Sequence, residues 1–503
     1  MNESLDIAQG KEVEQPSPVP AEENAQQDLP PAAETGLPVS DTAAETELPV
    51  SATAAGTGLP VSAPAAGTRP PVSAPAAGTE PQASPPAAGT ESPVSTSAAG
   101  TAPPSATPAE KPGQPGKSPA KQGLISRLIF KLPLGVLVAV CVLPAVLIAL
   151  FYILLPNTDA MGWVSIYVSA PVRGFMGMLT SVYPFSVTEV LLTAAIIWLV
   201  FYLVKTVMVT VRRRKKLRIL SKRFLLVAVL ALYVWSAFCW LWSSGYHAPG
   251  FAERNGFARS GVSIEDLKEV TKHFADRANE LAPLVARDSS GSFDESRSEL
   301  FATSTGIFEN IAAEFSCLNG SLYRAKPMMF SWLMSRTGYS GMYFALTGEA
   351  NINNMTPGAF LPVTLAHEHV HQLGVFAEDE ANFVGILASI KSDNAVFAYS
   401  GYLLGLNHLL NALSSSDVNA WHEIAESLTY EVWRDRRDSS DFWLSQRTVD
   451  TDIWFIDTTL TSLTGAVRET VDAAYDSFLK SQNQELGLQS YGACVDLLVE
   501  YFS

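Results

Sequence analysis

Three long apolar runs constrain this chain of 503 residues more than any other feature of its sequence. They occupy residues 132–155, 187–211 and 224–246. Each is long enough to cross the hydrocarbon core of a bilayer, about 30 Å thick, as a single helix. Buried core helices are the alternative, but three such runs with basic flanks favour a membrane protein. We therefore predict a region of three transmembrane helices over residues 130–246.

The basic residues indicate how these runs are oriented. Lysines and arginines precede the first run, residues 212–223 read RRRKKLRILSKR, and the 156–186 segment carries one basic residue, Arg173. Because positive charge stays on the cytoplasmic side, we expect the N-terminus and 212–223 inside and 156–186 outside. Three crossings then place everything after residue 246 outside the cytoplasm. The expected location is the cell membrane, with the lipid bilayer as a partner.

Residues 1–122 have a composition that cannot form a packed core. They are rich in Ala, Pro, Thr, Ser and Gly, and AAET or AAGT recurs every eleven residues from position 32 to position 98. The repeats contain proline and lack the apolar seam of a coiled coil. The segment also begins without the basic and apolar regions of a signal peptide. We predict a disordered cytoplasmic tail.

Charge and cysteine content exclude two kinds of site. The net charge is −16, which argues against nucleic acid as a partner, since phosphate binding needs a basic face. No Cys-x-x-Cys pair is present, so a cysteine zinc cluster is not expected. Cys317 and Cys494 could pair in an oxidising space, but their separation alone is weak support for a disulfide. Nothing in the sequence sets the oligomeric state.

Residues 247–503 are predicted to form a separate, mostly helical domain. Ser263 has the position of an N-cap for a helix over 263–285. The stretches GMYFAL (341–346) and ANINN (350–354) have the character of short strands. Further helices are expected at 395–413, 418–434, 450–481 and 490–502.

The stretch LAHEHVHQLG at 365–374 contains the candidate metal-binding and catalytic residues. Pro362 can start a helix and Gly374 can end it. His367 and His371, four residues apart, would share one face of that helix and could bind one tetrahedral zinc ion. Glu368 lies beside that face and could remove a proton from a water on the metal, as in the H-E-x-x-H motif of metallopeptidases. His369 would point away.

A catalytic zinc site usually has a third protein ligand. The position that a metzincin-like pattern would use is Ala377, which cannot bind a metal. Glu378 and Glu380 follow, at the start of a second expected helix. A carboxylate there could return to the zinc, as in glutamate-ligand zincins. We favour Glu380 as the ligand, with Glu378 as the alternative ligand or as a partner to a histidine.

Other polar residues are candidates for binding substrate. The segment 342–355 precedes the histidine helix, where an edge strand could pair with an extended peptide. Asn351 and Asn353 would then lie near the cleft, although a simple turn is an equally good interpretation. The group that stabilises the oxyanion must come from elsewhere. The candidates are Tyr399, Tyr402 and His408, and the sequence does not choose among them.

With these residues identified, the chain resembles the bacterial domain-of-unknown-function family 3810, membrane proteins with a zincin-like C-terminal domain. The resemblance covers about 130–503 and excludes the repetitive tail. It implies a membrane-bound protein similar to zinc peptidases, with His367, Glu368, His371 and the 378–380 acids at the site, but it supplies no substrate. The stretches that carry it are 183–192, 245–256, 341–353, 365–385, 399–413 and 475–498.

The sequence thus predicts a mostly α-helical membrane protein with an α+β, zincin-like (gluzincin-type) domain outside the cytoplasm. The expected function is zinc-dependent hydrolysis of extracytoplasmic proteins or peptides, with one zinc ion as cofactor. Two alternatives come from other classes. One is a zinc-binding sensor or scaffold without catalysis, and the other is an interaction protein that acts through its tail.

Overall fold

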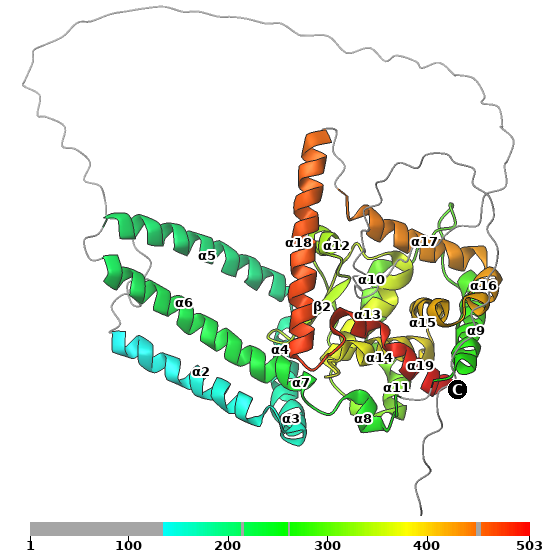
Figure 1. The fold of residues 1–503 in the computed structure, drawn as a ribbon, viewed down its shortest axis with the longest axis horizontal. Helices are drawn as coiled ribbons and strands as arrows, with labels where there is room; N and C mark the ends of the chain where they lie inside the picture. Colours follow the sequence, from blue (N-terminus) through cyan, green and yellow to red (C-terminus); the bar gives the residue numbers. More distant parts are fainter. Residues whose placement is uncertain (1–133, 213–215, 260–261, 449–453) are drawn as a thin grey trace, which may run out of the picture. The chain divides into compact units, whose positions relative to one another are not determined.

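The computed structural model describes residues 134–212, 216–259, 262–448 and 454–503 (Figure 1). The predicted tail at 1–122 lies outside these residues. The described chain is mostly helical, as expected, with one small sheet.

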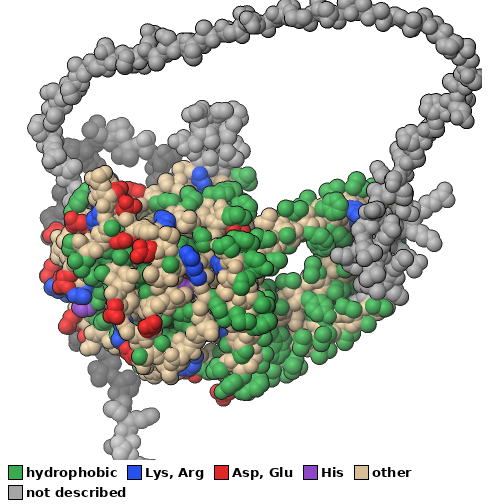
Figure 2. Space-filling view, turned by 180° about the vertical axis from the view of Figure 1, so that it is seen from behind, with side chains coloured by type: hydrophobic (Ala, Val, Ile, Leu, Met, Phe, Trp, Pro, Cys, Tyr) green, Lys and Arg blue, Asp and Glu red, His purple; other side chains and the backbone are tan. Residues whose placement is uncertain are grey.

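The apolar runs form three helices. They are α2 (Leu134–Leu154), α5 (Val187–Arg212) and α6 (Lys216–Phe238), and α6 continues through a π-helical turn, η2 (Cys239–Ser243), into α7 (Ser244–Tyr246). Both α2 and α5 pack against α6. Val187–Val211 and Leu220–Tyr246 are long and apolar enough to cross a membrane, whereas α2 contains a shorter apolar stretch, Val138–Leu154. In Figure 2, hydrophobic side chains dominate the surface of these helices.

The 156–186 segment, expected only as an external connection, is largely helical. It contains α3 (Thr158–Val164), a π-helical turn η1 (Ser165–Ser169) and α4 (Ala170–Ser181), which follow one another without a break. Pro171, which has no backbone N–H, comes just after the π-helical turn, where the regular hydrogen-bond ladder of the helix is already interrupted.

The C-terminal region is a helical domain. Its N-cap prediction is confirmed, because the Ser263 side chain accepts a hydrogen bond from the backbone N–H of Asp266. The predicted helix over 418–434 is wrong in one respect, since it divides into two helices at Leu428 and Thr429. The helices are α8 (Phe251–Asn255), α9 (Ile264–Leu281), α10 (Arg297–Thr303), α11 (Glu309–Glu314), α12 (Ser331–Thr337), α13 (Leu361–Gln372), α14 (Glu378–Lys391), α15 (Ala395–Ser416), α16 (Val418–Ser427), α17 (Tyr430–Ser445), α18 (Trp454–Ser481) and α19 (Cys494–Phe502).

Short 3₁₀ turns connect several of these helices. They are η3 (Ala282–Leu284), η4 (Gly306–Phe308), η5 (Ser316–Leu318), η6 (Gly358–Phe360) and η7 (Gly487–Gly492). Cys317 and Cys494 are both free thiols, so the disulfide that the sequence left open does not form in this structure.

The sheet has the strand order β1-β3-β2. β1 (Lys326–Pro327) pairs in parallel with β3 (Glu349–Ile352), and β2 (Gly341–Phe344) pairs with β3 in the antiparallel sense. The two predicted strands are therefore confirmed as β2 and β3. β2 lies at an edge of the sheet and packs on α13, which carries the histidines, and within the described part of the chain β3 is its only strand partner.

Two buried carboxylates join α5 to the domain, and we call these contacts the carboxylate exchange. Glu349 of β3 accepts hydrogen bonds from the backbone N–H groups of Val187 and Thr188, at 3.0 and 2.8 Å. In the other direction, Glu189 of α5 accepts from the N–H groups of Met329 and Phe330, at 2.8 and 2.6 Å. The first N–H groups of a helix have no partner within the helix. Glu349 satisfies two of them at the start of α5, and Glu189 satisfies two N–H groups of the segment between β1 and α12.

Replacing Glu349 should therefore destabilise the whole assembly. In Glu349→Ala the N–H groups at the start of α5 would be buried without an acceptor, which costs roughly 1–3 kcal/mol for each unsatisfied group. Glu349→Gln keeps an acceptor oxygen and should lose less. Thermal unfolding of the full chain in detergent micelles measures both variants. An unchanged melting temperature in Glu349→Ala would show that these contacts contribute nothing.

Candidate functional site

Two helices bring the candidate site together. α13 has Pro362 in its first turn and ends before Gly374, whose φ of +91° is accessible to glycine without strain. The chain then turns back into α14, which begins at Glu378. Gly385 of α14 lies directly on α13, because a Cβ placed there would be 3.1 Å from the backbone nitrogen of His367. The absence of a side chain at 385 lets the two helices approach closely.

His367, His371 and Glu378 form a cluster that could hold a metal ion. Their ligand atoms all lie within 4.8 Å of one another. Glu378 Oε2 is 3.3 Å from His367 Nε2 and 3.6 Å from His371 Nε2. All three side chains are buried. Two imidazole nitrogens and one carboxylate are a common ligand set for a catalytic zinc ion.

Other groups fix the orientation of both imidazoles. His371 Nδ1 donates a hydrogen bond to the carbonyl of Val375 at 2.8 Å, so its Nε2 faces Glu378. His367 Nδ1 lies 2.9 Å from Asn382 Oδ1, which can hold that ring in the same tautomer. Such partners on the outer nitrogens are typical of metal-binding histidines.

The charges within the cluster shift the pKa values of His371 and Glu378. Burial lowers the pKa of His371, but attraction to Glu378 outweighs this and raises it to about 9. Burial acts in the opposite sense on Glu378, but the two histidines hold the pKa of that carboxyl well below its usual range. A cation would have to displace the proton from His371, so protons and metal compete for this cluster.

The side chain of Glu368, on α13, points toward β2 and lies against Gly341. A Cβ at Gly341 would be 2.4 Å from Glu368 Oε1, so only glycine at 341 leaves room for this carboxyl. Its Oε2 is buried without a hydrogen-bond partner. Burial raises the pKa of Glu368 to about 7, and the neighbouring charges of His367 and His371 limit the rise. A carboxyl with this pKa can both accept and release a proton near neutral pH.

Two tyrosines that the sequence analysis missed contact the third member of the cluster. Tyr475 of α18 donates a hydrogen bond to Glu378 Oε1 at 2.9 Å, and the hydroxyl of Tyr246, the last residue of α7, lies 3.5 Å from the same oxygen. They are 97 and 132 residues from Glu378 along the chain, and no local motif indicates either of them. Together they hold one carboxylate oxygen and leave Oε2 facing the histidines.

The structure brings Glu378, the alternative ligand, to the two histidines, and it does not bring Glu380 there. Glu380 accepts hydrogen bonds from the N–H groups of Phe251 and Ala252 and from the guanidinium of Arg259, so its carboxylate is bound elsewhere. The physical reason is helical periodicity. Residues two apart in a helix point about 200° away from each other, so only one of the two acids can face α13.

The predicted substrate-binding residues are not brought to the cluster. Asn351 is fully buried and bonds Ser186, and Asn353 bonds Ser335 and the carbonyl of Tyr339. The hydroxyl of Tyr399 donates to Asp435, and the ring of Tyr402 packs edge-on against that of Phe274. These four side chains support the fold.

Two further histidines, His369 of α13 and His408 of α15, lie outside the cluster. His369 points away from the cluster, as expected, and its Nε2 lies 2.9 Å from Ser304 Oγ. Burial and, to a smaller extent, the charge of His367 lower the pKa of His408 to about 4. His408 is therefore near the cluster without belonging to it, and its buried Nε2 has no hydrogen-bond partner.

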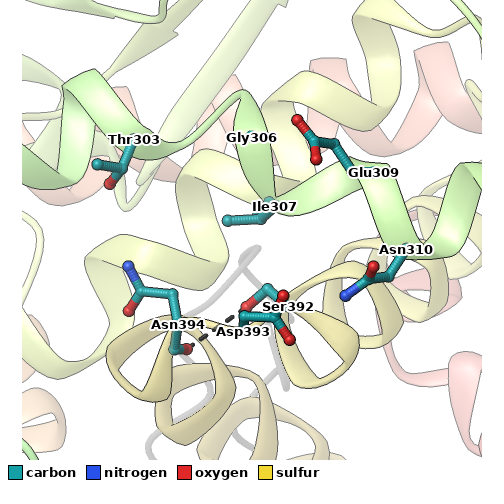
Figure 3. A pocket seen from close by; sticks show the side chains of 8 residues that line it. All are labelled: Thr303, Gly306, Ile307, Glu309, Asn310, Ser392, Asp393 and Asn394. Carbon is teal, nitrogen blue, oxygen red and sulfur yellow. Dashed lines mark hydrogen bonds between the residues drawn. The ribbon is translucent and has the colours of Figure 1, made fainter.

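A surface pocket lies apart from this cluster (Figure 3). It is formed by residues 303–310 and by the turn 392–394 between α14 and α15. Its side chains include Glu309 and Asp393 but no histidine, and none of the cluster residues lines it. We assign no role to it.

Comparison with known proteins identifies the family. The model of the family described as "Protein of unknown function (DUF3810)" matches residues 165–499. This is more than half of the chain, so the chain belongs to that family. No curated protein matches the chain. No solved structure matches it either.

The geometry predicts opposite behaviour for the two acids of α14. Glu378→Ala should weaken metal binding by at least about 100-fold, since it removes a ligand where even an outer partner contributes 10–100-fold. Glu380→Ala should retain the metal and lower thermal stability, because it leaves donors of α8 unpaired. Zinc titration of the full chain measures the first effect. Loss of metal in Glu380→Ala alone would contradict the assignment.

Asn382 should act through His367. Asn382→Ala removes the partner of Nδ1 and should weaken zinc binding about 10–100-fold while leaving the fold intact. Ser389→Ala is a matched control on the same helix, because the Ser389 hydroxyl donates to the carbonyl of Gly385 within α14. Equal zinc affinity in the two variants would show that Asn382 does not orient the ligand.

Proposed function

We propose that this member of the DUF3810 family is a membrane-anchored zinc-dependent peptidase that cleaves extracytoplasmic proteins or peptides. The observation that carries the proposal is the position of Glu368. It is a buried carboxyl with a pKa near 7, beside two histidines and a glutamate whose ligand atoms converge. A structural zinc site has no need of such a group, whereas metal-assisted hydrolysis requires a base at this position.

The donor set fits a zinc ion. Both imidazoles present Nε2 toward Glu378, and the buried oxygen Glu368 Oε2 has no hydrogen-bond partner. Buried carboxylate oxygens are costly unless a cation, a proton or a water satisfies them. A zinc ion held by His367, His371 and Glu378 would supply a Lewis acid that polarises a peptide carbonyl and lowers the pKa of a water molecule.

Glu368 and β2 supply the other requirements of peptide hydrolysis. Glu368, buried beside the cluster, would accept a proton from the attacking water and pass it to the nitrogen of the leaving amine. β2 is an edge strand that lies against Glu368 through Gly341. An extended peptide that pairs with its open edge would present a carbonyl near the cluster. This arrangement favours a zincin-like domain.

The anchor in this proposal consists of three spans. The apolar stretch of α2 is counted as a third span beside the two longer apolar segments of α5 and α6–α7. The start of α5 at Val187 and the end of α7 at Tyr246 both contact the domain. Helices that meet the domain at one end and basic residues at the other favour a cytoplasmic tail and an extracytoplasmic domain.

A zinc-binding sensor without catalysis is the second candidate. The observation that favours it is the contact of Tyr246 with Glu378, because it links a ligand to the end of an apolar helix. The sensor would bind zinc but would be indifferent to the loss of Glu368 as a base.

Glu368→Gln separates the two candidates. In the full chain, reconstituted in lipid nanodiscs, the wild type should contain about one zinc ion and cleave members of a mixed peptide library detected by mass spectrometry. Glu368→Gln should retain zinc and lose about 10²–10⁴-fold in cleavage rate, the usual contribution of a general base. His371→Ala should lose the metal as well as the activity.

Glu309→Gln provides the matched control. It makes the same chemical change at an exposed position of α11 and should leave both zinc and cleavage unchanged. Cleavage that persists at the wild-type rate in Glu368→Gln would overturn the peptidase mechanism. Zinc binding without cleavage in the wild type would favour the sensor.

A further inference from the structure

The continuous helix formed by α3, η1 and α4, residues 158–181, has an inverted pattern of burial. Its buried positions recur every three or four residues and form one stripe along the helix. That stripe consists mainly of small and polar residues. It contains Gly162, Ser165, Ser169, Arg173, Gly177 and Thr180, and two buried apolar residues, Met161 and Val164, lie near its N-terminal end.

The opposite face of this helix is large and apolar. Its side chains have exposed fractions of 47% to 64%, and we call them the outward face: Trp163, Ile166, Tyr167, Phe175, Met178 and Leu179. The 158–181 helix has only two charged residues, Asp159 and the buried Arg173. A helix in water buries its large apolar residues and exposes its polar ones. The reverse pattern is typical of a helix that packs on protein through small residues and faces lipid with the rest.

The buried stripe fixes the helix against the ends of the apolar segments. Ser169 Oγ donates a hydrogen bond to the carbonyl of Trp240, and the guanidinium of Arg173 donates to the carbonyl of Leu241 at 3.1 Å. Both carbonyls belong to the last turns of the apolar segment Leu220–Tyr246. The helix thus crosses this segment at its end and not along its length.

The other contacts of the helix are made by the domain. Thr180 donates to the carbonyl of Thr347 at 3.0 Å, and the ammonium of Lys326 on β1 donates to the carbonyls of Thr180 and Tyr183. A positive charge at the C-terminal end of a helix is favourable. The helix is therefore held between the ends of the apolar segments and the sheet.

Chain continuity identifies what covers the outward face. The helix begins four residues after α2 ends at Leu154 and ends six residues before α5 begins at Val187. Both ends are thus tied to apolar helices, at the level where those helices meet the domain. This is the level of the headgroups if the apolar segments cross a bilayer, and Trp and Tyr are enriched there. A continuous apolar face of this kind is otherwise rare on a surface exposed to water.

We propose that the outward face of the 158–181 helix lies in the interfacial layer of the bilayer and holds the domain against the membrane surface. The helix would lie in the plane of the interface and would not cross it. The proposal goes beyond the peptidase function and does not depend on metal binding.

The same helix is linked to the candidate site through one aromatic ring. The guanidinium of Arg173 lies 4.9 Å from the ring centroid of Phe376, and that ring stacks on His371 with 6.2 Å between centroids. The interfacial helix and the histidine cluster are therefore separated by a single layer of side chains. The site would lie close to the membrane surface and at a fixed distance from it.

Site-directed spin labelling of the full chain tests the proposal. The accessible thiols Cys141 and Cys317 are replaced by Ala, while the buried Cys239 and Cys494 remain. A nitroxide is then attached at Tyr167→Cys or Phe175→Cys, and the protein is reconstituted in phosphatidylcholine nanodiscs. Power saturation compares collision rates with oxygen, which partitions into lipid, and with a water-soluble nickel chelate.

Two exposed positions set the scale. Ile197→Cys, in the middle of α5, provides the lipid reference, and Ser298→Cys, on α10, provides the water reference. The oxygen-to-nickel ratio at residues 167 and 175 should lie between the two references and well above the ratio at residue 298. A ratio equal to that at residue 298 would place the face in water and overturn the proposal. Low collision rates with both reagents would show that protein, such as a second copy of the chain, covers the face, and would overturn it too.

Discussion

The carboxylate exchange between α5 and the sheet is the constraint on which the rest of the structure depends. Glu349 of β3 satisfies backbone donors at the start of α5, Glu189 of α5 satisfies those of residues 329–330 just after β1, and both carboxylates are buried. Neither element can separate from the other without leaving several polar groups unpaired, which is costly away from water. β3 pairs with β2 and packs on α13, so the position of the histidine helix is fixed through the sheet by an apolar helix far earlier in the chain.

Two helices in direct contact supply all the residues of the candidate site. α13 supplies both histidines and Glu368, and α14 supplies Glu378 across the close contact at Gly385. Ligands on two helices in direct contact are held more precisely than ligands on loops. The tyrosines from α7 and α18 fix the remaining carboxylate oxygen, so each ligand has a second partner that limits its rotation.

Sequence reasoning succeeded where the relevant spacing is local. A separation of four residues places His367 and His371 on one face of a helix whatever surrounds it, and Pro362 and Gly374 delimit that helix. The sequence could not indicate that Glu378, and not Glu380, lies beside the histidines, because this depends on how α14 is rotated against α13. Tyr246 and Tyr475 were beyond reach, since only the tertiary fold brings them to Glu378. The helix at 158–181 was missed because its apolar residues face outward.

The carboxylate exchange also has a consequence for biogenesis. The first residues of α5 precede Glu349 by about 160 positions, so the ribosome completes the helix long before the strand. Domains generally fold in the order of synthesis, and the start of α5 would act as a template on which β3 is nucleated. The C-terminal domain, cut out at residue 247, would lack that template. The folding unit of this protein therefore begins inside the apolar region, upstream of the boundary that hydropathy alone would draw.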